Sequence, residues 1–182
     1  MITHQDMVDL YGRDNVITLT HQEVDGLGVA PRDSEVLTTV GLPRMSAPFF
    51  TTETQGGPEF LRVIDVTTRD GKKHREVIVG GPPGDSGMRF SLSAYERFVM
   101  LVQLDGTKPR GEVVNNNLGE FVEFLYRIEM FTQDVASDPT VKEQLFDDLE
   151  GALTGIDPFS FELPENWWAM ALRQLGGGDL GI

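Results

Sequence analysis

Residues 111–128 read GEVVNNNLGEFVEFLYRI, and this stretch decides the fold class. Its first part suits a β-strand, because Val113 and Val114 are β-branched residues that pack well in a sheet. From Leu118 onward the apolar side chains recur every three or four residues, which is the period of a helix with one buried face. Asn117 lies between the two parts and is a favourable N-cap residue. The sequence therefore predicts a strand that leads directly into a long helix.

More strands are expected upstream of this junction. Their segments are rich in β-branched and aromatic residues and are bounded by turn signals: 60–66, 74–79, 89–92 and 98–104. The pair Asp70-Gly71 is a hairpin signal, so we expect the first two strands to be antiparallel neighbours. The run 98–104 is almost continuously apolar, which is typical of a central strand covered on both faces. Together with 111–114, these segments predict a meandering, mostly antiparallel sheet of about five or six strands.

The N-terminal third predicts two short helices. Thr3 is a capping residue for a helix that ends before Gly12. The second helix begins near Asp33 and ends at the stop signal Gly41-Leu42-Pro43, because glycine favours a helix end and proline prevents continuation.

Two further helices are expected beyond the junction. The pair Asp138-Pro139 is a helix start signal, and a last helix covers about residues 165–175. Helices, then strands, then helices is an α+β order, with the helices packed on one face of the sheet. We therefore expect one α+β domain over residues 1–175 and a flexible, glycine-rich tail over 176–182.

The composition of the 182-residue chain narrows its possible functions. Fifteen basic and 29 acidic residues give a net charge of −14, which repels phosphate backbones and argues against nucleic-acid binding. The chain has no cysteine and its three histidines are scattered, so neither disulfides nor a metal site are expected. No apolar run has the ~20 residues of a membrane span, and the N-terminus lacks the pattern of a secretory signal. We expect a cytoplasmic protein that does not bind membranes; its oligomeric state stays open.

Three stretches contain residue types used in catalysis, but none forms a complete site. The glycine-rich segment 80–87 has two prolines and no lysine, which fits a wide turn better than a phosphate-binding loop. Ser86 within it lacks the motif of a nucleophile elbow. Asp147 and Asp148 would project about 100° apart on a helix and would not share a substrate. We therefore predict no catalytic residue, no cofactor and no metal ion, and a protein that is not an enzyme.

Binding to another protein is the remaining class. Residues 120–182 contain 13 acidic and three basic residues, a surplus of 13 − 3 = 10 negative charges. These charges form either a solvated face or a surface for a basic partner, and four of them on one helix are candidate partner contacts: Glu143, Asp147, Asp148 and Glu150. Asn115 and Asn116 suit either turn chemistry or a partner contact. Trp168 suits either the core or a binding position.

The order and spacing of these motifs resemble the SUKH superfamily of bacterial immunity proteins, and most closely its fourth subgroup. The most specific part of the resemblance is the strand, asparagine junction and Phe-bearing helix of 111–128. Other matching motifs cover most of the chain: Gly41-Leu42-Pro43 with Phe49-Phe50, Val77-Ile78-Val79-Gly80, 101–105, Ile156-Asp157-Pro158, and Trp167 or Trp168. The chain departs from the family where Asn116 and Asn117 take the place of the usual serines.

The resemblance implies a non-catalytic domain that binds a polymorphic toxin, often a nuclease or a nucleic-acid deaminase, and occludes its active site. An enzyme that acts on nucleic acid usually carries a basic cleft, so the acidic charge is compatible with this role. The first alternative is a SUKH-like scaffold or regulatory adaptor that binds an endogenous cytoplasmic protein. The second is an enzyme of unrecognised type.

Overall fold

A computed structural model describes residues 2–67, 73–85, 87–94, 96–104 and 110–177. Within them, the main sheet has five strands in the order β5-β6-β7-β8-β9, each antiparallel to the next. The strands are β5 (Val63–Thr67), β6 (Lys73–Gly80), β7 (Met88–Ser93), β8 (Val99–Gln103) and β9 (Arg110–Asn115). The predicted antiparallel meander is confirmed. The run 98–104 contains β8, an internal strand that pairs with β7 on one side and β9 on the other, and its Val99, Leu101 and Val102 side chains are buried, as predicted for a central strand.

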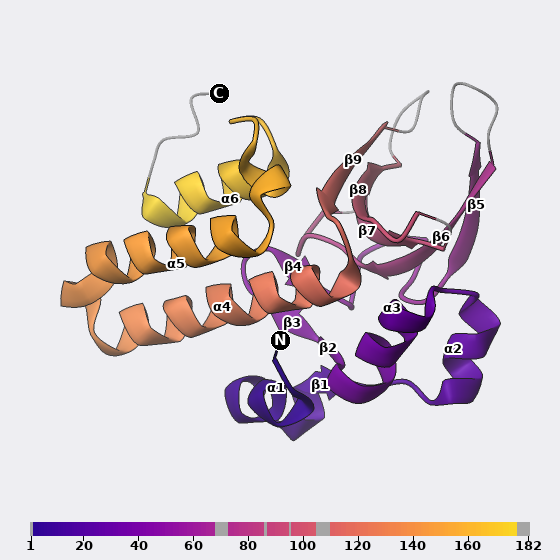
Figure 1. Cartoon of the computed structure of the whole chain (residues 1–182), viewed down its shortest axis with the longest axis horizontal. Coiled ribbons are helices and arrows are strands. Elements are labelled where there is room, and N and C mark those ends of the chain that lie inside the picture. The colour runs from indigo at the N-terminus through magenta and orange to yellow at the C-terminus, as the bar shows by residue number, and fades with distance from the viewer. Residues whose placement is uncertain (1, 68–72, 86, 95, 105–109, 178–182) are drawn as a thin grey trace.

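The described part of the chain has six helices. They are α1 (His4–Tyr11), α2 (His21–Leu27), α3 (Pro31–Glu35), α4 (Leu118–Ser137), α5 (Lys142–Ile156) and α6 (Trp167–Gly176). In Figure 1, α1–α3 lie below the sheet and α4–α6 lie to one side of it. Shorter helical turns are η1 (Arg13–Asn15), η2 (Val36–Val40), η3 (Pro139–Val141) and η4 (Pro158–Phe161). Two small ribbons pair β1 (Val16–Ile17) with β2 (Leu42–Pro43), and β3 (Met45–Ser46) with β4 (Phe50–Thr51). The predicted α+β class is confirmed, but α2 and both ribbons were not predicted.

The tail predicted for residues 176–182 is only partly described. Gly176 is the last residue of α6, and Gly177 follows it in the left-handed conformation that ends many helices, with φ +88°. Residues 178–182 lie outside the described residues, as do the predicted hairpin turn Asp70-Gly71 and Ser86.

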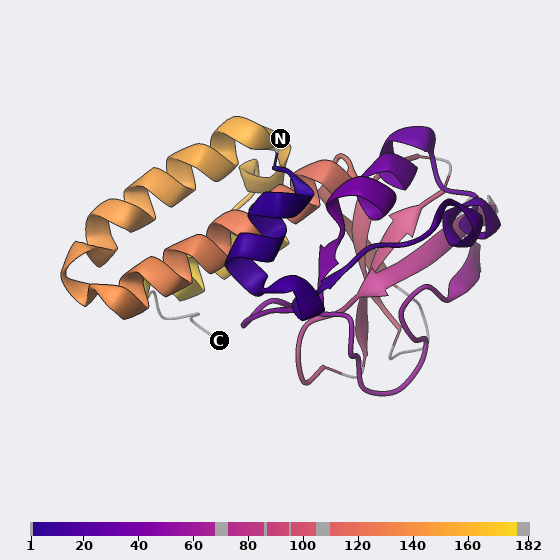
Figure 2. The same ribbon diagram turned by 90° about the horizontal axis from the view of Figure 1, so that it is seen from below.

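Helix α4 connects the sheet to the other helices. It starts beside the sheet and runs away from it, and α5 returns alongside it toward the sheet (Figure 1, Figure 2). The Asn117 side chain accepts a hydrogen bond from the backbone N–H of Glu120 at 3.0 Å, as the predicted cap requires. A second cap comes from Asp33 of α3, which lies 85 residues away and accepts a hydrogen bond from the Leu118 N–H at 3.2 Å. Asp33 is buried, and this burial raises the pKa of its carboxyl.

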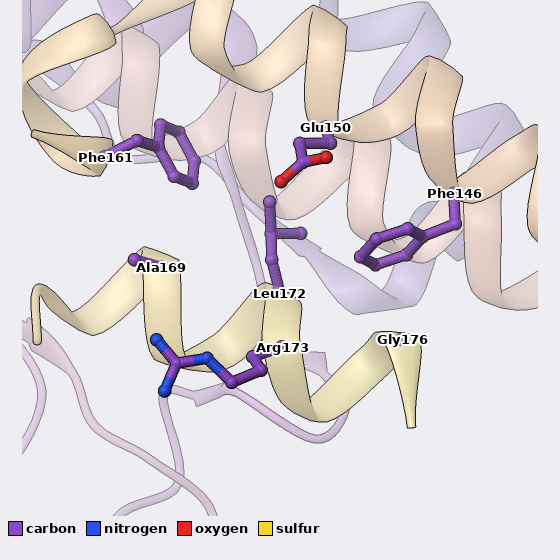
Figure 3. Close-up of a pocket in the computed structure, with 7 residues that line it drawn as sticks. All are labelled: Phe146, Glu150, Phe161, Ala169, Leu172, Arg173 and Gly176. Carbon is purple, nitrogen blue, oxygen red and sulfur yellow. The ribbon is translucent and has the colours of Figure 1, made fainter. Parts of the chain in front are cut away.

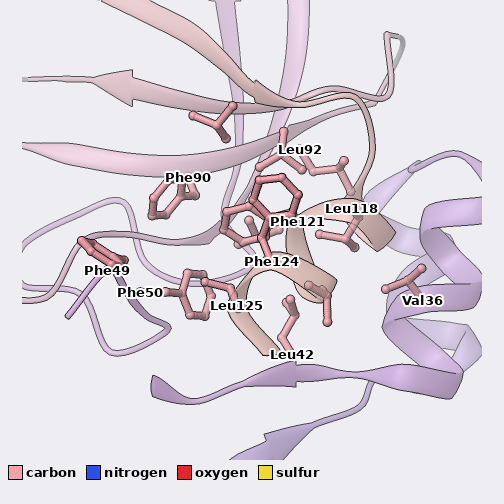
Figure 4. Packing of buried hydrophobic residues seen from close by; sticks show 14 of the residues in the cluster. Val36, Leu42, Phe49, Phe50, Phe90, Leu92, Leu118, Phe121, Phe124 and Leu125 are labelled. Carbon is pink, nitrogen blue, oxygen red and sulfur yellow. The ribbon is translucent and has the colours of Figure 1, made fainter. Parts of the chain in front are cut away.

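An aromatic cluster joins α4 to the sheet and to α6. Phe90 of β7 points toward Phe121 of α4, with 5.1 Å between ring centroids (Figure 4). Phe50 of β4 packs edge-on against Phe121, with 5.6 Å between ring centroids. The ring centroids of Phe124 and of Trp168 in α6 lie 5.3 Å apart. All five rings are fully buried, and such pairs contribute about 0.5–1.5 kcal/mol each beyond area burial. The cluster therefore fixes the positions of four elements relative to one another.

The opposite face of the sheet contains a buried cation. Arg89 follows Met88 in β7 and points away from the face that carries Phe90, because side chains alternate along a strand. Its guanidinium donates hydrogen bonds to the backbone carbonyls of Gln55 at 2.6 Å and Pro58 at 3.0 Å. Burial lowers the pKa of Arg89. Arg89 thus attaches the loop before β5 to the middle of the sheet.

Candidate partner-binding surface

A buried polar network lies at the junction between β9 and α4. The Asn115 side chain donates a hydrogen bond to Asp157 Oδ2 at 3.1 Å and accepts one from Trp168 Nε1 at 2.8 Å. Ser160 Oγ lies 2.8 Å from Asp157 Oδ2. All four side chains are buried, with at most 2% exposure. The network therefore ties the end of β9 to the end of α5, to η4 and to α6.

This burial corrects the prediction that Asn115 and Trp168 contact a partner. Every polar side-chain atom of the two residues bonds within the protein, and neither side chain reaches the surface. Asn116 is exposed, but its side-chain amide donates to Asp157 Oδ1 at 2.8 Å and its backbone N–H donates to Oδ2 at 3.3 Å. The asparagine junction is thus primarily a structural lock around one carboxylate.

The importance of Asp157 and Ser160 was not predicted from sequence. They lie 41 to 46 residues from Asn115, Asn116 and Val114, so no local pattern pairs them. The Ile156-Asp157-Pro158 motif of the family resemblance was the one signal at this position.

The predicted acidic contacts on α5 are all exposed, but they do not share one side of the helix. Glu143, Asp147 and Glu150 follow each other at intervals of four and three residues and form one stripe. Asp148 projects about 140° from Glu143 at 100° per residue. It borders a separate hollow between α4 and α5, together with Met130 and Leu149. A partner that binds one side of α5 would therefore contact three of the four residues.

Glu150 of the acidic stripe lines a groove of about 420 Å³ between α5 and α6. Phe146 and Phe161 flank Leu172 in this groove, and the Glu150 carboxylate projects between the rings (Figure 3). Arg173 of α6 also lines it, with Ala169 and Gly176. Phe146, Phe161 and Leu172 are the large apolar residues of its lining, beside one acidic and one basic residue, and such a mixture suits contact with a protein surface.

Metal-binding clusters and membrane-spanning helices are absent from the described ranges. No group of three or more His, Asp or Glu residues there could hold a metal ion. No helix in this part of the chain is long and apolar enough to cross a membrane.

Comparison with known proteins assigns the chain to a family. A family model described as SUKH-4 immunity protein matches residues 2–174. The chain belongs to the SUKH-4 immunity protein family. This match confirms the resemblance inferred from sequence, and it includes the asparagine junction, α5 and almost all of α6. No curated protein and no solved structure matches this SUKH-4 protein significantly.

Proposed function

We propose that this SUKH-4 protein is an immunity protein that binds a cognate toxin, such as a nuclease or deaminase, and neutralises it by occluding its active site. Membership of the SUKH-4 family carries the proposal. In this role the protein binds without catalysing a reaction, and it acts in the cytoplasm of the cell that makes the toxin.

The charge of the C-terminal helices supports a basic partner. Eight carboxylate side chains between residues 118 and 177 are exposed: Asp134, Asp138, Glu143, Asp147, Asp148, Glu150, Glu162 and Glu165. In the same range Arg173 is exposed, whereas Arg127 and Lys142 are half-buried. Such a surface attracts a basic cleft over a distance of about 8 Å at physiological ionic strength and raises the association rate. We therefore propose that the stripe Glu143, Asp147 and Glu150 faces the toxin.

The proposal is tested by co-expressing the chain with the toxin encoded beside its gene. We expect growth to be rescued and the two proteins to co-purify. Rescue without association would rule out occlusion, and binding without rescue would favour the adaptor role. Absence of both would refute the proposal.

Charge reversal tests whether the acidic stripe on α5 faces the toxin. The triple substitution Glu143→Lys, Asp147→Lys and Glu150→Lys should lower the association rate constant by about tenfold or more at low salt. The matched control makes the same change in net charge at three exposed residues far from α5 in sequence: Asp9→Lys, Asp14→Lys and Asp25→Lys. Equal effects of the two triple variants would show that only the net charge matters and that α5 does not face the toxin.

A further inference from the structure

We propose that the segment 157–166, here called the anchor loop, inserts Phe159 and Leu163 into an apolar pocket on the toxin that is surrounded by lysine or arginine side chains. This inference rests on the proposed immunity function and specifies its interface. In this interface the acidic stripe on α5 accelerates association, and the anchor loop holds the complex together.

The anchor loop carries unusual apolar exposure. Phe159 is 49% exposed and Leu163 is 50% exposed. Among the described residues, the other large hydrophobic side chains of comparable exposure are Met45, Met130 and Val141, each on a separate element. Phe159 is the aromatic member of this set, and aromatic residues, Phe included, are enriched in protein–protein interfaces. Two such side chains within five residues mark this loop as an interaction surface.

Hydrogen bonds hold the anchor loop in place although its tips, the Phe159 and Leu163 side chains, are exposed. Asp157 and Ser160 attach it to the buried network described above. The Asn166 side chain donates to the Phe159 carbonyl at 3.2 Å, and the Asn166 backbone N–H donates to the Leu163 carbonyl at 3.1 Å. Because the loop is already ordered, binding through it loses little conformational entropy. The buried Asn115 and Trp168 thus support partner binding indirectly, because their hydrogen-bond network holds Asp157 at the start of the anchor loop.

The charges around the tips specify the chemistry of the partner. Glu162 and Glu165 are exposed beside Phe159 and Leu163, and the sequence has no lysine or arginine from 157 to 172. The next cation, Arg173, donates a hydrogen bond to the Pro164 carbonyl at 2.8 Å. An acidic partner, an anionic membrane or a nucleic acid would be repelled. A complementary surface offers an apolar pocket for the tips and cations for the two carboxylates.

The test measures binding of a catalytically inactivated toxin domain, encoded beside the gene, to immobilised full-length protein. The variant Phe159→Ala/Leu163→Ala should weaken the affinity about 30-fold or more, mainly through faster dissociation. The matched control is Met45→Ala, which truncates a side chain of similar exposure (51%) on β3 and should leave the affinity unchanged. A second variant, Glu162→Lys/Glu165→Lys, should slow association without changing the urea midpoint of unfolding.

Each outcome decides between the two proposals. If the wild-type protein does not bind the toxin, the proposed function fails and the anchor loop fails with it. If the wild type binds and both loop variants bind equally well, only the anchor loop is refuted. If sedimentation equilibrium shows a wild-type dimer that the alanine variant loses while toxin binding persists, the loop is a self-association surface and the inference is wrong.

Discussion

Replacing Asp157 by alanine tests whether the buried network holds the C-terminal helices to the sheet. The Asp157 carboxylate accepts hydrogen bonds from the Asn115 side chain, from the Asn116 side chain and from the Asn116 backbone N–H. Ser160 Oγ lies 2.8 Å from the same carboxylate. Asp157 is itself completely buried at the end of α5, so alanine removes all of these contacts at once.

The expected loss of unfolding free energy depends on which of the former hydrogen-bond donors to Asp157 water can reach after the substitution. Asn116 is exposed, so water can replace the bond to its side chain at little cost. Asn115 is completely buried, and the Asn116 backbone N–H also loses its acceptor. Each of these two donors loses its carboxylate acceptor at a cost of about 1–3 kcal/mol, so we expect Asp157→Ala to lower the free energy of unfolding by about 2–6 kcal/mol. Asp157→Asn retains one acceptor oxygen, and its expected loss is about 1 kcal/mol.

Urea unfolding followed by tryptophan fluorescence and far-ultraviolet circular dichroism measures this loss. The control is Asp148→Ala on the same helix, because Asp148 is exposed and bonds to the Gln144 side chain. Its expected effect is within about 0.5 kcal/mol. A loss below about 1 kcal/mol for Asp157→Ala would show that the hydrogen bonds only offset the cost of burying the carboxylate. The network would then not hold the C-terminal helices to the sheet.

Three further perturbations test other parts of the fold. Arg89→Met leaves the carbonyls of the loop before β5 without their donor and should cost about 2–4 kcal/mol of unfolding free energy, measured by urea unfolding; a neutral result would contradict the bridging role of Arg89. Gly80→Ala would place a Cβ atom 2.5 Å from the Phe50 ring, so we expect at least about 3 kcal/mol of destabilisation, and an unchanged melting temperature would contradict that contact. Glu76 accepts a hydrogen bond from Ser91, and burial raises the pKa of its carboxyl. The folded state therefore binds this proton more tightly than the unfolded state does. Stability falls as pH rises from the pKa of Glu76 in the unfolded state to its pKa in the folded state. Glu76→Gln should therefore gain stability over the wild type at pH 7 and lose that gain on acidification; a gain independent of pH between 7 and 4 would refute this assignment.

Local signals in the sequence predicted most of the regular elements. The Thr3 cap is followed by α1, Asn117 caps α4, and Asp138 precedes η3 and α5. These predictions succeeded because a cap and its helix lie within a few residues of each other. The strand meander was predicted because short turns favour pairing of successive strands. Helix α2 and the small ribbons were missed, since such short elements are stabilised mainly by tertiary packing.

The candidate surface was less predictable than the fold. The exposure of Glu143, Asp147 and Glu150 on one side of α5 follows from helical spacing alone. Burial of Trp168 does not, because adjacent tryptophans on a helix give no indication of which one enters the core. The exposed Phe159 and Leu163 were not predicted either, since apolar residues next to prolines fit a buried turn equally well.

By itself, the sequence determined the α+β class, the helix starts, the acidic character of the C-terminal third and the resemblance to the family. Each of these depends on composition or on residues close together in the chain. Only the tertiary structure decided that Asn115 meets Asp157 and Trp168 across 42 and 53 residues, and that Asp33 caps α4 across 85. Contacts at such separations arise when packed elements bring their side chains together. The residue type tells what a side chain can donate or accept, but not which distant residue is its partner. The strand-to-helix junction at 111–128 was therefore predicted as a local feature. Its place at the centre of the buried hydrogen-bond network follows instead from α5, η4 and α6, which pack around it.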